Sequence, residues 1–296
     1  MRYEIFQTCY LPGQIKKAHA EFKILDCTEH NTSEFREVEC IQQTINEGKT
    51  DALDAWGFFS PRWQDKLPHT PEQIRKKIEA NPNHDVYVFG HSLARTALFA
   101  NPWDELFFLS SSDRDIAKKF MAFILGDLWP IEKVYYLEFF SNHACYGNYF
   151  VAKRAFWEKY DAFVRTILLK LHDIPTEMRS ISSDLFSIDT PYASLQTQVI
   201  ERLLDTFLHI FSKNHKIFYI ENNYSHYQKR LEKTSLDALW ALYQLKQTIL
   251  DPSISGLTKV QNWHALRLFA LKTFPRLYSA DNPFSCMLSN PEVVKI

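Results

Sequence analysis

The sequence predicts an α/β fold, with an open sheet flanked by helices and a mostly helical C-terminal region. Three observations predict it. Short segments rich in aromatic and β-branched residues alternate with amphipathic helical segments as far as residue 90. Turn signals built on proline, glycine and asparagine separate them. After residue 195 almost every segment has a helical period.

The expected strands are short. The first covers residues 3–10 and stops at Pro12, where a turn signal begins. Further strands are expected at residues 23–27, 54–60, 84–90 and 133–140. Ligands of open α/β sheets bind beyond the carboxyl ends of the strands. The loops after Cys9, Ser60 and Phe89 are therefore the expected place of a site.

The expected helices follow the periodic return of apolar side chains. The best-delimited one starts at Thr70, an N-cap residue, with Pro71 at the first helical position and Glu72 in the first turn. It ends near residue 80. Gly48 closes the preceding helix as a C-cap would. The other helices are expected at residues 14–22, 33–45, 113–128, 153–171, 198–211, 231–250 and 263–271.

Composition and charge exclude several function classes. The 34 lysines and arginines are balanced by 35 aspartates and glutamates, so no net field attracts nucleic acid. Only 7 glycines stand beside 23 phenylalanines, which argues against a glycine-built nucleotide cradle. Glu4 interrupts the N-terminal apolar residues, and no segment reaches the roughly 18 apolar residues of a membrane span. We expect neither export nor a membrane-spanning segment.

The five cysteines form an odd set without Cys-x-x-Cys spacing. Such a set fits neither a disulfide framework nor a zinc knuckle, so a reducing cytoplasm is the expected location. The cysteines are Cys9, Cys27, Cys40, Cys145 and Cys286.

Three short motifs fail their tests. Gly48-Lys49-Thr50 resembles the end of a P-loop, but Gln43 stands where that motif needs glycine. No Gly-x-Gly-x-x-Gly is present, and the sequence around Ser92 lacks the Gly-x-Ser-x-Gly elbow of serine hydrolases. Dinucleotide binding and serine-hydrolase chemistry are therefore not indicated.

Asp113 and Asp115 form the chain's Asp-x-Asp pattern. In many sugar transferases this pattern holds the divalent metal that bridges the donor diphosphate. Here a helical period follows directly, so capping of a helix N-terminus is the favoured interpretation and metal binding the alternative. The histidines form no zinc motif. No cofactor is certain from the sequence, and a divalent metal is not expected.

Two polar clusters are candidates for a binding or catalytic site. Ser60, Arg62 and Lys66 follow an expected strand end; arginine and lysine bind phosphate oxygens, and the indole of Trp63 could stack on a base. A solvated basic turn is the equal alternative. Glu201 and Arg202 open the most amphipathic helix, where a structural ion pair is favoured over catalysis.

Two further features leave alternatives open. Asn148 follows a glycine and is either a turn residue or a polar group presented to a ligand. Near the C-terminus, basic and apolar residues interleave around Arg267 and Arg276. Packing of this helix against the core is favoured, and contact with a membrane surface is the alternative.

An ordered set of segments carries a resemblance to a known family. FRE at 35–37, WGFFSPRW at 56–63 with Lys66, and NPNHDVY at 81–87 resemble proteins encoded in bacterial capsule and lipopolysaccharide clusters. GNYFVAKRAFWEKY at 147–160 and IERLL at 200–204 are similar to segments of bacterial galactofuranosyltransferases with a GT-A fold. The resemblance covers roughly residues 3–210.

The resemblance implies a cytoplasmic glycosyltransferase of the hexosyltransferase type, with peripheral contact to the inner membrane face as an open alternative. Its donor would be a nucleotide sugar and its acceptor a lipid-linked, lipopolysaccharide or capsule glycan. Residues 1–210 would form a GT-A-like domain, and residues 211–296 a helical extension packed on it. The relatives carry His-Tyr-Arg-Arg where this chain has the run ending in Pro61-Arg62, so galactofuranose is not implied as the donated sugar. Gly90-His91-Ser92 stands where an Asp-x-Asp is expected, which weakens a metal-assisted mechanism further.

Roles follow from this resemblance and from the chemistry of each side chain. Glu201 is expected to take the acceptor's proton with Arg202 orienting it, and Asp85 is the reserve. Arg62 and Lys66 would neutralise the leaving diphosphate. The full set of expected donor-binding residues is Thr8, Cys9, Tyr10, Ser60, Arg62, Lys66 and Asn148. The alternatives are a sugar-phosphate transferase of capsule synthesis and a non-catalytic scaffold that binds glycans or a partner.

Overall fold

The computed structural model describes most of the N-terminal two thirds of the chain and the C-terminal helices. The described residues are 1–30, 35, 37–89, 93–109, 114–126, 128, 141, 143–145, 147–176, 178, 195–220, 227–228, 231–249 and 257–274. The expected strand at residues 133–140 and the segment Gly90-His91-Ser92 lie outside them.

A six-stranded sheet in the order β2-β1-β3-β5-β4-β6 forms the centre of the fold. Strand β5 is antiparallel to both of its neighbours, and the remaining pairs are parallel. The carboxyl ends of the parallel strands therefore share one edge with the start of β5. The strands are β1 (Tyr3–Cys9), β2 (Lys23–Asp26), β3 (Ala55–Phe59), β4 (Val86–Val88), β5 (Phe150–Lys153) and β6 (Ile217–Tyr219).

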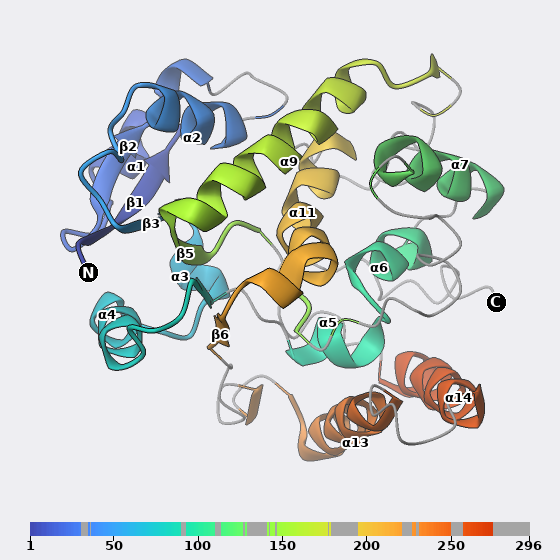
Figure 1. The fold of residues 1–296 in the computed structure, drawn as a ribbon. Helices are drawn as coiled ribbons and strands as arrows, with labels where there is room; N and C mark the ends of the chain where they lie inside the picture. The colour runs from blue at the N-terminus through green and yellow to red at the C-terminus, as the bar shows by residue number, and fades with distance from the viewer. Residues whose placement is uncertain are drawn as a thin grey trace.

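Helices cover both faces of the sheet. Figure 1 shows α9 crossing the molecule between α2 and α11, with α13 and α14 grouped near α5. The helices are α1 (Pro12–Ile15), α2 (Glu37–Asn46), α3 (Trp63–Lys66), α4 (Pro71–Ala80), α5 (Leu93–Leu98), α6 (Pro102–Leu109), α7 (Arg114–Leu125), α9 (Arg154–His172), α11 (Leu195–Phe211), α13 (Lys233–Ile249) and α14 (Leu257–Thr273). Two 3-10 turns are η1 (Thr28–His30) and η2 (Ser212–Asn214).

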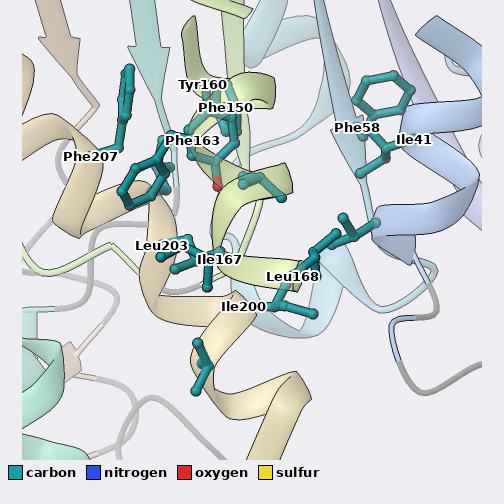
Figure 2. Close-up of a cluster of buried hydrophobic side chains, with 14 of the residues drawn as sticks. Ile41, Phe58, Phe150, Tyr160, Phe163, Ile167, Leu168, Ile200, Leu203 and Phe207 are labelled. Atoms are coloured by element: carbon teal, nitrogen blue, oxygen red, sulfur yellow. The ribbon is translucent and has the colours of Figure 1, made fainter. Parts of the chain in front are cut away.

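Alternation along the strands divides the core into two layers. Phe6 and Phe58 pack on the face covered by α2, α9 and α11, whereas Ile5 and Phe59 pack on the face covered by α3 and α4. Figure 2 shows part of the first layer, with side chains from α2, the sheet, α9 and α11 together. Trp157 attaches α9 to the sheet, because its indole donates a hydrogen bond to the carbonyl of Trp56 in β3 at 2.8 Å.

The close approach of β5 to β3 explains why a glycine, Gly57, stands in the middle of a buried strand. A Cβ at this position would collide with the carbonyl oxygen of Phe150 and lie 2.8 Å from a methyl group of Val151. Strand β5 therefore approaches β3 more closely than any larger residue at position 57 permits.

The C-terminal helix α13 packs against both α5 and α14. Lys246 is completely buried, and its ammonium donates to the carbonyls of Thr96 and Phe99 at 2.6 and 2.5 Å. The indole of Trp263 donates to the carbonyl of Ala97 at 3.0 Å. Because the last carbonyls of a helix lack partners within it, these donors both cap α5 and attach the C-terminal helices to it.

The open sheet flanked by helices confirms the predicted α/β class and is consistent with a GT-A-like fold. Several details depart from expectation, among them the helices α3, α5 and α6, which were not expected. Strands β5 and β6 were expected as parts of helical or loop regions. β6 pairs with β4, so the sheet extends past the domain boundary expected at residue 210. The helix expected at 14–22 ends at Ile15.

Cys27 and Cys40 form a disulfide, with their Cα atoms 5.9 Å apart. The expectation that the cysteines stay unpaired is therefore wrong for this pair, because chain folding brings the loop after β2 against the first turn of α2. The cysteine argument for a reducing compartment loses its basis. Across the described helices, none is both long enough and apolar enough to cross a membrane.

Candidate active site at the carboxyl edge of the sheet

Most of the polar residues expected to bind a donor gather at one edge of the sheet. This edge holds the ends of β1 and β3 and the start of β5. Thr8 at the end of β1 donates a hydrogen bond to the carbonyl of Phe59 at 3.2 Å, and the Tyr10 hydroxyl donates to Thr8 at 3.4 Å. Pairing of parallel strands thus brings residues about fifty positions apart into contact.

Tyr149 connects the two sides of this edge. Its hydroxyl lies 2.5 Å from the hydroxyl of Ser60, and the Lys66 ammonium lies 5.6 Å from the centre of its ring. Sequence reasoning missed Tyr149. The available signal was its place immediately after Asn148, at the start of a segment whose residues alternate between the two faces of the sheet.

Lys66 and Glu201 form the charged centre of the site. The Lys66 Nζ lies 3.6 Å from a carboxylate oxygen of Glu201, and the two side chains are 42% and 29% exposed. Partial burial would raise the pKa of Glu201, but the charges of Lys66, Arg202 and Arg95 and the contact with Lys66 lower it overall. Glu201 is therefore ionised at neutral pH and able to accept a proton.

A tight turn holds Glu201 against the start of β5. Gly147 adopts a left-handed conformation with φ of 76°, and its amide donates to the backbone carbonyl of Glu201 at 2.9 Å. Asn148 follows in a buried position, where its amide oxygen accepts a hydrogen bond from the Tyr160 hydroxyl at 3.2 Å. Asn148 is thus anchored from α9, beside the site and on the other face of the sheet from Ser60.

Arg202 belongs to a buried ion network. Its guanidinium donates to the carbonyl of Pro102 at 2.8 Å and to Glu105 at 3.2 Å, and Arg95 lies 3.2 Å from the other oxygen of Glu105. This agrees with the structural ion-pair interpretation of Arg202. The side chain is 2% exposed, so its influence on Glu201 is through charge.

Asp85 is not part of the site. It lies immediately before β4, at the amino end of that strand and hence at the opposite edge of the sheet. Its carboxylate accepts hydrogen bonds from the Lys153 ammonium at 3.1 Å and the Lys216 amide at 2.9 Å. Burial opposes ionisation, but these bonds outweigh it and lower the pKa of Asp85. Asp85 joins β5 to the segment before β6.

Three residues expected to touch a nucleotide are too buried to do so. Thr8 and Cys9 are 1% and 0% exposed, and the Trp63 indole is buried against Phe22 with ring centres 5.0 Å apart. The expectation that this indole stacks on a base is therefore wrong, because the first residue of α3 turns into the core. Tyr10 is half-buried, whereas Arg62 is exposed at the same edge.

The structure leaves the alternative of a metal site at Asp113 and Asp115 untested. Asp113 lies outside the described residues, and only the backbone of Asp115 is described, in the first turn of α7. Within the described part of the chain, no group of three or more histidine, cysteine, aspartate or glutamate side chains is placed to hold a metal ion. The described edge offers the basic side chains of Arg62 and Lys66 to a diphosphate.

Comparison with known proteins gives one distant likeness. A solved apo structure of WbbM, a bifunctional glycosyltransferase, is similar to this chain with a TM-score of 0.44 and 13% sequence identity. The match covers 75% of this chain and 44% of that protein, so the chain spans less than half of the WbbM chain. No protein-family model matches the chain, and neither does any curated protein sequence.

Proposed function

We propose that the chain is a glycosyltransferase that moves a hexosyl group from a nucleotide sugar to a lipid-linked, lipopolysaccharide or capsule glycan. The observation that carries the proposal is the Lys66–Glu201 pair, which lies with Ser60 and Tyr149 at the carboxyl edge of an open α/β sheet. Such edges are where α/β folds bind their ligands. The resemblance of the segments around these residues to glycosyltransferases supports the same reaction.

In an inverting transfer, the acceptor hydroxyl attacks the anomeric carbon as the bond to the donor diphosphate breaks. The proton leaves the acceptor oxygen and passes to the Glu201 carboxylate. Negative charge grows on the departing nucleoside diphosphate, where Lys66 and the exposed Arg62 supply positive charge.

Because Lys66 and Glu201 form a salt bridge, binding of the donor would change the basicity of Glu201. A diphosphate carries more negative charge than one carboxylate and competes for Lys66. When Lys66 moves toward the diphosphate, Glu201 loses the neighbour that lowers its pKa most and becomes a stronger base. Donor binding thus prepares Glu201 to accept the proton.

Variants at this pair test the proposal. Glu201→Gln should lower the release of nucleoside diphosphate, measured with a panel of nucleotide sugars and a bacterial membrane extract as acceptor, by about 10²- to 10⁴-fold. Lys66→Met should lower it by about 10²- to 10³-fold. The matched control is Glu232→Gln, the same change at an exposed position before α13, which should keep the wild-type rate.

Each outcome has a distinct meaning. Full turnover by Glu201→Gln would remove Glu201 as the base. Absence of turnover with every donor, in folded wild-type protein, would contradict the transferase. Mass analysis of the product separates transfer of a sugar from transfer of a sugar phosphate, and glycan binding that no nucleotide influences would instead support a scaffold.

A further inference from the structure

Tyr149 is a buried tyrosine whose ring and hydroxyl each contact one polar residue of the candidate active site. The Lys66 ammonium lies over its ring, 5.6 Å from the ring centre, and the Ser60 hydroxyl lies 2.5 Å from its own hydroxyl. Tyr149 itself is 3% exposed and offers a ligand little surface. The side chain of Lys66 is 42% exposed and Ser60 is half-buried, so a ligand can reach both of them.

The surroundings of Tyr149 fix its ring in place. The ring packs against that of Phe59 at nearly a right angle, with ring centres 5.7 Å apart. On another side the backbone of Gly147 is so close that a Cβ there would lie 3.1 Å from the ring. The carbonyl of Tyr149 accepts a hydrogen bond from the Phe89 amide at 2.8 Å, which joins it to the residue after β4. The ring is therefore a rigid support for the groups that contact it.

Ser60 and Lys66 lie on one short segment that leaves β3. The Trp63 amide donates to the carbonyl of Ser60 at 3.1 Å, and the Leu67 amide donates to the carbonyl of Trp63 at 2.8 Å. A lysine side chain on such a segment loses rotamer freedom when its ammonium binds an anion. An attraction to the ring that is present before the anion arrives removes part of this loss.

We propose that Tyr149 is a positioning residue for phosphate binding, whose ring holds the Lys66 ammonium while its hydroxyl donates to Ser60. A phenol is the stronger donor of the two hydroxyls, which leaves the proton of Ser60 for a phosphate oxygen. Hydrogen bonds in such a chain strengthen one another. Lys66 and Ser60 then donate to the same phosphate group. That this phosphate belongs to a nucleotide sugar rests on the proposed function.

Binding of inorganic pyrophosphate to the full chain tests this role without a sugar or a base. Isothermal titration calorimetry gives the dissociation constant at one fixed temperature. Tyr149→Phe keeps the ring and removes the hydroxyl, so it should weaken binding about two- to tenfold. Tyr149→Leu also removes the ring and should weaken binding by a further factor of about two to five.

The matched control is Tyr87, another buried tyrosine of the same core layer. Its hydroxyl donates to the carbonyl of Asn81 at 2.7 Å. Tyr87→Phe therefore also removes a buried hydroxyl from its hydrogen bond, but it should leave the affinity for pyrophosphate unchanged.

Double-mutant cycles separate positioning from a merely structural role. In a Ser60→Ala background, Tyr149→Phe should cause no further loss of affinity, because its hydroxyl no longer acts on a second donor. In a Lys66→Met background, Tyr149→Leu and Tyr149→Phe should bind pyrophosphate equally, because no ammonium remains for the ring to hold. Losses that add in the Ser60→Ala background, or wild-type affinity of Tyr149→Leu, would overturn the proposal.

Acetylation of Lys66 tests the ring contact without any ligand. Acetic anhydride reacts with the neutral amine of lysine, whereas the ring attracts the ammonium. Tyr149→Leu should therefore speed acetylation of Lys66, followed by mass spectrometry, about two- to fivefold relative to Tyr149→Phe. The exposed Lys76 of α4 should react at the same rate in both variants. Equal rates at Lys66 would contradict the proposal.

The proposal and the proposed function fail separately. Pyrophosphate binding that depends on Tyr149 as described, without turnover of any nucleotide sugar, would keep the positioning role and reject the transferase. Turnover of a nucleotide sugar together with additive losses in the Ser60→Ala cycle would keep the transferase and reject the positioning role. Absence of pyrophosphate binding in folded wild-type protein would also reject the positioning role.

Discussion

At the scale of single residues, burial decides which charged groups serve the fold and which serve the site. Glu201 and its neighbour Arg202 are adjacent in sequence, yet one is 29% exposed beside Lys66 and the other is locked into a buried network with Glu105. A helix places consecutive residues about 100° apart, so such neighbours point in different directions. The sequence indicates that Glu201 and Arg202 are candidates, but only the packing of α11 shows that Glu201 is the one that faces the site.

Asp205, one helical turn after Glu201, is a buried carboxyl group with a structural task. Its Oδ1 accepts hydrogen bonds from the Ser141 hydroxyl at 2.9 Å and the Cys145 amide at 3.2 Å, while its Oδ2 has no partner among the described residues. Burial raises the pKa of Asp205 to about 7, although both bonds and Lys246 act in the opposite direction. The native state therefore keeps Asp205 protonated at pH values where the unfolded chain has lost this proton.

This burial predicts a pH dependence of stability. A carboxyl group whose pKa is near 3.8 when unfolded and about 7 when folded binds a proton more tightly in the native state, so its contribution is lost as pH rises between these values. Asp205→Asn keeps an acceptor at Oδ1 and cannot ionise. Its melting temperature relative to wild type should rise from pH 4 to pH 7 and level off above pH 8.

The control for this prediction is Asp237→Asn, the same change at an exposed position of α13. The difference in melting temperature between this variant and wild type should be small and flat over the same range. If the difference in melting temperature between Asp205→Asn and wild type were also independent of pH, Asp205 would be ionised over the whole range. Other contacts would then have to stabilise its buried charge.

At the scale of elements, the sequence predicts well wherever local chemistry marks a boundary. The hydroxyl of Thr70 accepts from the Gln73 amide at 3.2 Å, and α4 covers the residues that its cap and proline indicate. Strands β5 and β6 carry no comparable local signal. Their three or four residues become strands because β4 pairs with both of them. A short stretch of sequence does not reveal pairing between residues so far apart in the chain.

The Cys27–Cys40 disulfide attaches α2 to the loop after β2. Cross-linking residues 13 positions apart restricts the unfolded chain, which corresponds to about 3 kcal/mol of stability. The double variant Cys27→Ser/Cys40→Ser should therefore lower the free energy of unfolding by about that amount in urea titrations. Reductant should produce the same loss in wild type and none in the variant.

Equal stability of this variant and wild type under oxidising conditions would contradict the disulfide. The free cysteine Cys145 provides the control, because it is buried and takes no part in the disulfide, so Cys145→Ser should leave the reductant effect in place. The Cys145 thiol is a poor nucleophile, since burial raises its pKa.

At the scale of the whole molecule, the carboxyl edge of the sheet is the place where sequence and structure agree. Strand order brings Ser60, Lys66 and the start of β5 together, as the rule for α/β sheets predicts. The same rule separates Asp85, because it precedes its strand. The sequence could not show how deeply each side chain is buried. The side chains of Cys9 and Trp63 are buried and therefore out of reach of a ligand.

We propose that this edge binds a nucleoside phosphate, the leaving group of the donor, through Lys66. A ligand that binds only the folded state raises the melting temperature. The most direct measurement is a thermal-shift comparison of wild type and Lys66→Met with UDP, GDP, CMP and TDP, each with and without manganese. We predict a selective shift with one nucleotide in wild type, independent of manganese and strongly reduced in Lys66→Met. No shift with any nucleotide in folded wild-type protein, or an equal shift in Lys66→Met, would contradict it.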